Sequence, residues 1–370
     1  MKKILSFFAF AAMVFSFAAC NKGGEPEIKS LQVKANALWT KAQVIITPSN
    51  SAATYFYNYA KASEVEAVGL EQYVTNQLAS KPWEEWESSE RFDQGKQKKV
   101  LQLLSAQTKY ILYVCFVEKY NNEEDEGKVY AKIAGDIVPQ EFTTTRYWLL
   151  NGEFTVNANN KKVQFNSANS RWQNGSLHAN DADQWSCFGR TQAPEPYDLL
   201  DKSVCITDAN REYVLAGPEW WYLFMERPRA EELFAHGTVN NITGLIVLPD
   251  NWETPEGVKL ITDKELGILR ASSFDTKYFN DDINGYSKNK YTKEEWADLE
   301  YAGAVFLPAA GMGGLNKNVK GYYWSRTGAG TGSNIFRFER NLVDLSFTKN
   351  STYDTNSSKM SLRLVREVGK

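Results

Sequence analysis

Few residues in this chain could act as a nucleophile or hold a metal ion. The two histidines, His178 and His236, lie in neither a His-Glu-x-x-His zinc motif nor a Gly-x-Ser-x-Gly nucleophile motif. Carboxylates such as Asp250, Glu253 and Asp344 could hydrolyse a glycosidic bond as a pair, but their abundance does not indicate that any two converge. The sequence therefore predicts no catalytic residue, no metal site and no cofactor.

A cysteine near the N-terminus predicts attachment to a membrane. A basic start and an apolar run over residues 4–17 lead to Ala18-Ala19-Cys20, and small residues before a cysteine are typical of a lipoprotein signal peptide. We expect residues 1–19 to be the signal peptide, Cys20 to carry the lipid and residues 20–27 to form a tether. No later stretch approaches the roughly 20 apolar residues of a spanning helix. We therefore expect an outer membrane lipoprotein, on the periplasmic face or at the cell surface, whose membrane partner is the lipid on Cys20.

The other three cysteines are too few for a disulfide scaffold. Cys115 lies in the middle of an expected strand, where it should pack as an apolar side chain. Cys187 and Cys205 could form a disulfide in an oxidising compartment, or they could remain free thiols.

Length and composition favour two β-rich domains. About 350 residues follow the signal peptide, enough for two domains with separate cores. Aromatic residues make up 14% of the chain and occur in short alternating runs, which favours strands over helices. The net charge of −3 gives no basic footprint, so we expect no nucleic-acid partner.

Alternating apolar residues predict a first domain at residues 28–145. The expected strands cover residues 31–33, 42–47, 55–59, 110–117 and 128–134. Apolar residues at helical spacing over residues 70–78, before Pro82, predict one helix among these strands. The acidic loop at residues 121–127 is expected to be a solvated hairpin tip rather than a calcium site.

A motif in this domain resembles a known β-sandwich. Leu104, Thr108 and Tyr110 match the Leu-x-Pro-x-Thr-x-Tyr corner of fibronectin type III domains, with Ala106 in place of the usual proline. The segment is similar to the fibronectin-like modules of Bacteroidetes lipoproteins. This resemblance implies an all-β sandwich, here with one inserted helix, in which the tyrosine hydroxyl holds the loop that enters its strand. It also implies a spacer role, because such modules usually hold another domain away from the membrane.

From Trp148 onward the sequence contains scattered tryptophans, glycines and asparagines, and we place a second, mixed α+β domain at residues 146–370. A helix is expected over residues 219–234, which Pro228 must kink or end. Thr292 and Glu295 form a capping box that predicts a second helix. The expected strands are residues 244–249 and 304–308, whose continuous apolar character predicts central strands, together with residues 322–325, 335–338 and 362–365.

Five segments of this domain carry a second resemblance. They are Gly152–Val156, Gly244–Trp252, Gly303–Gly311, Tyr323–Ser325 and Ser361–Val365. In order and spacing they resemble the Fibrobacter-type major paralogous domain (FISUMP) group, which is similar to C-type lectin-like folds and to the formylglycine-generating-enzyme superfamily. The resemblance covers nearly all of residues 147–368. It implies a C-type lectin-like domain and constrains fold far more than activity.

The resemblance also implies that residues 321–356 form an exposed recognition face. Flat rings and forked donors are common on such surfaces. The ligand-binding candidates are Tyr322, Tyr323, Trp324, Arg326, Asn334, Arg337 and Arg340. Trp324 is more often core than contact, and Arg363 is expected to be a structural partner for a carboxylate or for main-chain carbonyls.

No activity follows from the resemblance. Cys187 and Cys205 do not lie in the late catalytic motif of formylglycine-generating enzymes, and the C-terminal domain lacks the Glu-Pro-Asn and Gln-Pro-Asp tripeptides of calcium-dependent lectins. We therefore expect a non-enzymatic recognition or adhesion lipoprotein, with the lectin-like domain as a head for a glycan or protein ligand. A fimbrial or envelope assembly subunit is the alternative, and a hydrolase on the same scaffold is a third hypothesis.

Overall fold

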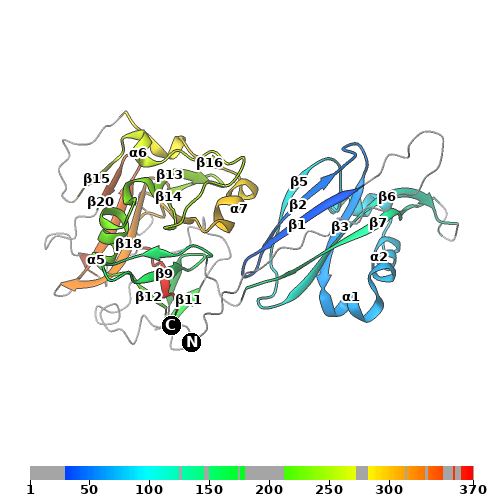
Figure 1. Cartoon of the computed structure of the whole chain (residues 1–370), viewed down its shortest axis with the longest axis horizontal. Helices are drawn as coiled ribbons and strands as arrows, with labels where there is room; N and C mark the ends of the chain where they lie inside the picture. The colour runs from blue at the N-terminus through cyan, green and yellow to red at the C-terminus, as the bar shows by residue number, and fades with distance from the viewer. Residues whose placement is uncertain are drawn as a thin grey trace, which may run out of the picture.

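The chain forms a β-rich structure whose hydrophobic cores fall into two separate parts. The computed structural model describes residues 30–123, 125, 127–145, 150–173, 176–179, 212–271, 282–312, 315–329, 332–344, 353–354 and 360–369. Two core clusters use only residues 31–142, and three use only residues 150–365. We refer to residues 30–145 as the N-terminal part and to residues 150–369 as the C-terminal part (Figure 1).

Two antiparallel sheets pack face to face in the N-terminal part. One has the order β1-β2-β5, and the other has the order β4-β3-β6-β7. Their strands are β1 (Leu31–Ala37), β2 (Ala42–Pro48), β3 (Tyr55–Lys61), β4 (Phe92–Asp93), β5 (Gln97–Leu101), β6 (Lys109–Asn121) and β7 (Val129–Thr143). Val44 of one sheet and Tyr57 and Leu112 of the other share one core, because alternate residues of a strand face the same side. All five strands expected in this region are present.

Helices cover the outer face of the four-stranded sheet (Figure 1). They are α1 (Ala62–Val68), α2 (Leu70–Ala79) and α3 (Trp83–Ser88), so the prediction of a single helix was wrong. Gly69 separates α1 from α2 with a φ of 90°, which favours glycine, and Pro82 precedes α3. Phe56 points to this side of the sheet and packs its ring 5.1 Å from that of Trp86.

The expected tyrosine contact is present between β6 and the loop that precedes it. The hydroxyl of Tyr110 accepts a hydrogen bond from the backbone N–H of Ser105 at 2.9 Å. The ring stacks on Phe142, with 5.5 Å between the centroids. Tyr110 therefore fixes the loop before β6 while its ring contributes to the core.

The C-terminal part contains several separate sheets. Among the described residues their orders are β12-β22-β9-β8, β16-β13-β14-β17, and β15-β20-β19-β18 with β21 on β19, and β10 pairs with β11. The strands are β8 (Phe154–Thr155), β9 (Lys162–Phe165), β10 (Ser170–Gln173), β11 (Ser176–Ala179), β12 (Glu212–Val214), β13 (Phe234–Val239), β14 (Ile242–Val247), β15 (Leu269–Ala271), β16 (Lys290–Tyr291), β17 (Val305–Pro308), β18 (Lys320–Ala329), β19 (Gly332–Glu339), β20 (Leu342–Asp344), β21 (Tyr353–Asp354) and β22 (Leu364–Glu367).

One of the two strands expected at the centre of a sheet lies at an edge instead. The position of β14 is interior, whereas β17 pairs with β14 alone among the described strands. Every residue of β17 is buried, and Phe306 and Leu307 belong to different core clusters. The continuous apolar run therefore correctly predicted that β17 is buried on both faces. Burial does not, however, specify how many neighbouring strands form hydrogen bonds with it.

Helical segments connect these sheets. They are α5 (Gly217–Trp221), the π-helical turn η1 (Tyr222–Glu226), the 3-10 turns η2 (Ala230–Glu232) and η4 (Gly285–Ser287), α6 (Asp263–Leu266) and α7 (Lys293–Tyr301). The expected helix over residues 219–234 ends early, because Arg227 takes an extended conformation before Pro228. The capping box of α7 is confirmed, since the N–H of Glu295 donates to Oγ1 of Thr292 at 3.2 Å and the N–H of Thr292 donates to Oε2 of Glu295 at 2.8 Å.

Candidate functional site

The β18–β19 hairpin carries six of the seven predicted ligand-binding residues, and its aromatic side chains are buried. Tyr323 lies on one face of the hairpin with Phe336 in the main core. Tyr322 and Trp324 lie on the opposite face, in a second cluster. Tyr322 is 6% exposed, and Tyr323 and Trp324 are fully buried. A ligand at the surface cannot reach these three rings, so their positions support packing rather than direct contact.

The polar candidates differ in their accessibility. Asn334 is buried, and its Oδ1 has no hydrogen-bond partner among the described groups. Nε of Arg337 donates to Oδ2 of Asp344 at 2.9 Å, and only 15% of the arginine side chain is exposed. Arg340 is exposed in the turn after β19. The register pairs Arg337 with Tyr322, four residues before Arg326 in β18, so the arginines lie at different places along the hairpin.

Arg326 forms part of a cation–aromatic stack at an irregular position in β18. Cζ of its guanidinium lies 5.1 Å from the centre of the Tyr213 ring, and Nζ of Lys161 lies 4.4 Å from the same centre. Both cations also pair with Glu219, Lys161 at 2.7 Å and Arg326 at 3.2 Å. The stack of Lys161, Tyr213, Glu219 and Arg326 therefore joins the turn before β9 to β12, α5 and β18 at one place.

The tyrosine of the stack stays neutral. Burial raises the pKa of the Tyr213 hydroxyl well above its ordinary value, and Glu219 raises it further, so the hydroxyl stays protonated. Glu219 is almost buried and also accepts the backbone N–H of Ala216 at 2.8 Å. Lys161 and Arg326 remain 21% and 25% exposed, so each has donor groups that a ligand could reach.

A groove begins at Lys161 and was not predicted from the sequence. Its volume is about 520 Å³, and the turn between β8 and β9 and the end of β22 form its walls. The lining residues are Asn157, Asn159, Asn160, Lys161, Lys162, Glu367 and Val368. Oδ1 of Asn157 accepts the N–H groups of Asn159 and Lys161, both at 3.0 Å, which fixes the turn. The run of two asparagines and two lysines at a turn was the signal that could have revealed this groove.

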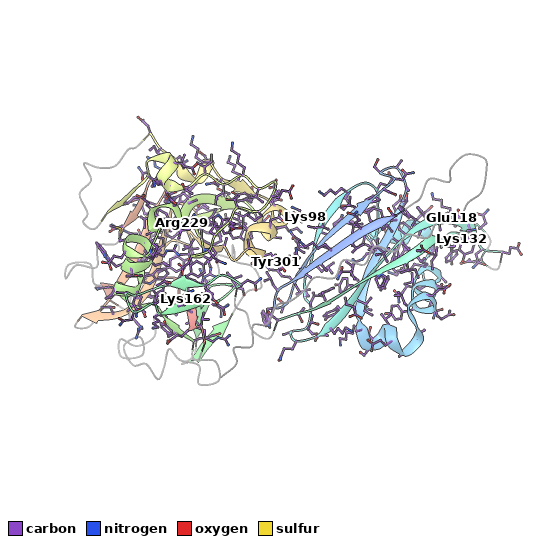
Figure 2. All side chains as sticks on the ribbon, viewed as in Figure 1. Lys98, Glu118, Lys132, Lys162, Arg229 and Tyr301 are labelled. Atoms are coloured by element: carbon purple, nitrogen blue, oxygen red, sulfur yellow. The ribbon has the colours of Figure 1, made fainter. Side chains whose placement is uncertain are left out.

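The groove offers polar rather than apolar contacts. Amide side chains can both donate and accept hydrogen bonds, the lysines can bind oxygen anions or hydroxyl groups, and Glu367 can accept from hydroxyl or amide donors. Lys162 lies at the groove and pairs with Glu153 at 3.4 Å, although more than a third of its side chain is exposed (Figure 2). Together with the neighbouring stack, this arrangement can bind a polar ligand through many weak, reversible contacts.

His236 and Asp250, two of the other groups considered for chemistry, have structural partners. His236 and Asp263 are fully buried, with Nδ1 2.6 Å from Oδ2 and the backbone N–H of His236 donating to Oδ1 at 2.7 Å. Asp250 accepts from Arg227 at 3.1 Å and from Oγ1 of Thr155 at 2.7 Å. Within the described residues, no three histidine, cysteine, aspartate or glutamate side chains gather closely enough to hold a metal ion.

The acidic loop between β6 and β7 uses one carboxylate internally. Asp125 accepts from the hydroxyl of Tyr130 at 2.7 Å and from Nζ of Lys128 at 3.0 Å. These two hydrogen bonds lower the pKa of the Asp125 carboxyl. The carboxylate is therefore occupied by donors of its own hairpin, as expected of a solvated tip.

Several predicted sites lie outside the described residues. They are the signal peptide at residues 1–19, Cys20, the tether at residues 20–27, and Cys187 and Cys205. Cys115 is described, and it is buried in β6 as a free thiol, as expected. Within the described residues, no helix has the length and apolar character needed to cross a membrane.

Comparison of the chain with known protein families, with curated proteins and with solved structures gave no match. The fold and the groove are therefore interpreted from their own geometry.

Proposed function

We propose that this chain is a cell-envelope-anchored binding lipoprotein of the outer membrane. In this proposal Cys20 carries the lipid, the N-terminal part is a fibronectin type III-like spacer and the C-terminal part is a C-type lectin-like head. The head binds a glycan or protein ligand without chemical conversion. Its contact surface is the groove at the turn between β8 and β9 together with the stack of Lys161, Tyr213, Glu219 and Arg326.

The arrangement of the N-terminal strands supports the spacer. A three-stranded sheet β1-β2-β5 facing a four-stranded sheet β4-β3-β6-β7 is the pairing that a fibronectin type III-like sandwich requires. The hydrogen bond from Ser105 to Tyr110 supports the same reading. The helices α1 to α3 are an addition to that pattern.

Two glycine contacts support the family proposed for the C-terminal part. A Cβ on Gly303 would lie 2.6 Å from Cα of Gly152, so these two residues, from different matched segments, must both lack side chains. A Cβ on Gly244 would lie 2.5 Å from the carbonyl oxygen of Leu307. The matched segments thus meet at close backbone approaches, as expected if they specify one fold.

The groove is the observation that carries the binding function. It joins amides, lysines and a carboxylate at the surface of a part in which the aromatic candidates Tyr322, Tyr323 and Trp324 are buried. A polar, open groove suits a ligand rich in hydroxyl or amide groups. The proposed ligand class is therefore a glycan or an extended polar protein segment.

A glycan and protein-matrix array with residues 28–370 tests this proposal. We expect saturable binding to one ligand class, and a weakening of about tenfold or more in Lys162→Glu with Asn159→Ala, because these changes remove two groove contacts and add repulsion. Arg326→Ala should weaken the binding of the same ligand, since it removes the guanidinium that packs on Tyr213 and pairs with Glu219.

Lys132→Glu is the matched control, because Lys132 pairs with Glu118 at 3.0 Å on the hairpin of β6 and β7, far from Lys162 (Figure 2). It should bind as the unchanged protein does. Binding that is equally strong in the groove variant would place the site elsewhere, and no binding by the folded fragment would favour the assembly alternative.

The assembly alternative would use strand β7, which lies at the edge of its sheet and is 15 residues long. A partner strand could add to such an edge. However, Pro139 lacks an N–H, and the register of β7 shifts between its pairings with Cys115 and Val117. Proline and bulges oppose strand addition, so we rank this alternative second.

A further inference from the structure

Helix α7 lies at the border between the two parts and contacts both. Figure 1 shows α7 of the C-terminal part facing the β1-β2-β5 sheet of the N-terminal part. Oδ1 of Asp298 accepts from Nε2 of Gln43 at 2.7 Å, and Oδ2 of Asp298 pairs with Lys98. Oε2 of Glu300 lies 2.5 Å from Nζ of Lys41. Two carboxylates of one helix therefore bind three polar side chains of the other part.

The N-terminal side of this contact is buried although it lies on an outer sheet face. Ala42 and Val44 point into the sandwich, so Gln43 between them points outward. Gln43 is nevertheless only 4% exposed, and its partner Asn36 is 5% exposed. Nδ2 of Asn36 donates to Oε1 of Gln43 at 3.0 Å, which orients the amide of Gln43 toward Asp298. Asn36 and Gln43 therefore present an oriented amide donor to the carboxylate of α7.

The opposite side of α7 anchors the helix in its own part. Trp296 and Leu299 are fully buried in a core cluster of the C-terminal part, and the Trp296 ring packs 5.6 Å from Phe306. Asp298 and Glu300 lie on the remaining surface of the helix and point to the N-terminal part. Because α7 is fixed in the core of the C-terminal part, any movement of the N-terminal part relative to the C-terminal part must break or change the contacts of Asp298 and Glu300.

We propose that α7 is an electrostatic clasp that fixes the orientation of the C-terminal part on the outer face of the β1-β2-β5 sheet. Lys41 and Glu300 are almost fully buried in this contact, with side-chain exposures of 7% and 2%. A buried ion pair adds little net stability, whereas docking in an orientation that buries either charge without its partner is strongly unfavourable. The clasp therefore selects one orientation out of the many that a connecting segment alone would allow.

A charge swap between Lys98 and Asp298 tests the clasp in residues 28–370. Lys98 is one-third exposed, so the fold should tolerate its replacement. Small-angle X-ray scattering of Lys98→Asp and of Asp298→Lys should show a larger radius of gyration. The ratio of docked to undocked molecules should fall about tenfold or more, equivalent to about 1.4 kcal/mol. The double variant restores opposite charges and should return the scattering curve toward that of the unchanged protein.

Circular dichroism shows whether each variant is folded, and Lys98→Gln offers a milder change that should shift the scattering in the same direction. Glu118→Lys with Lys132→Glu exchanges a pair far from α7 and should leave the scattering unchanged (Figure 2). Folded single variants with the scattering of the unchanged protein would overturn the clasp. A double variant that remains as open as the single variants would overturn its electrostatic basis.

Discussion

Arg363 provides the sharpest test of how the C-terminal part is held together. Its side chain is fully buried, NH1 donates to the carbonyl oxygen of Asn166 at 2.9 Å, and NH2 donates to that of Phe306 at 2.6 Å. Phe306 lies in the edge strand β17, so the guanidinium supplies a donor where a further strand is missing from the described sheet. We predict that Arg363→Met destabilises this part strongly.

The expected magnitude follows from the groups that lose their donors. Each buried carbonyl left unpaired costs about 1–3 kcal/mol, which gives roughly 2–6 kcal/mol for two. Burial lowers the pKa of Arg363 to about 10, so the guanidinium is charged at pH 7. Removing this buried charge relieves its desolvation cost, which offsets part of the loss from the two carbonyls. We expect a net loss of about 2–4 kcal/mol in the free energy of unfolding for Arg363→Met. Arg363→Lys should lose less, because an ammonium group can still reach one carbonyl.

Urea unfolding of residues 28–370, followed by tryptophan fluorescence, measures this loss. Trp220, Trp296 and Trp324 are fully buried in the C-terminal part and report on it. With a slope of about 3 kcal/mol per molar urea, the midpoint should fall by about 1 M. Arg229→Met is the control, since Arg229 forms only an exposed pair with Glu232 and should change stability by less than about 0.5 kcal/mol. A midpoint for Arg363→Met equal to that of the control would refute the reasoning.

Three further predictions concern single positions. Tyr110→Phe removes the hydrogen bond from Ser105 and should lower the unfolding free energy of the N-terminal part by about 1 kcal/mol, measured in urea. Gly321→Ala would place a Cβ 2.1 Å from the Phe338 ring, so thermal unfolding should show a loss of about 1–3 kcal/mol, and an unchanged midpoint would mean that the ring can move aside. Burial raises the pKa of the Cys115 thiol to about 12, so iodoacetamide at pH 8 should alkylate it only after unfolding, as peptide mass spectrometry can show. Labelling of native Cys115 would indicate that β6 opens.

Local patterns predicted local structure well in this chain. The capping box at Thr292, the tyrosine contact at Tyr110 and the burial of Cys115 each depend on neighbouring residues or on one strand. The helices α1 and α3 were missed because segments of seven and six residues are too short to show a helical period. The sequence also did not show whether a strand lies inside a sheet or at its edge. The strands β14 and β17 have similar apolar sequences, but they have different numbers of hydrogen-bonded neighbour strands among the described residues.

The candidate site depended on contacts that the sequence could not display. Phe336 faces the main core, and Trp324 on the opposite face of the hairpin is buried as well. Its cover includes Met360 and Leu362, which lie far along the chain. Arg363 was expected to be a structural partner for a carboxylate or for main-chain carbonyls, and the structure shows that it binds two carbonyls. The stack around Tyr213 combines four distant segments, so no spacing rule could assemble it.

The helical covers of the two N-terminal sheets have a consequence for how copies of this chain meet one another. Helices α1 to α3 occupy the outside of one sheet, and α7 occupies the outside of the other. Bare sheet faces and edges are the surfaces through which β-rich modules aggregate. If many copies are tethered side by side, each covered sandwich offers its neighbours little sheet surface to adhere to. Covered sheet faces therefore oppose aggregation, also in the dense population that the proposed lipid anchor would give.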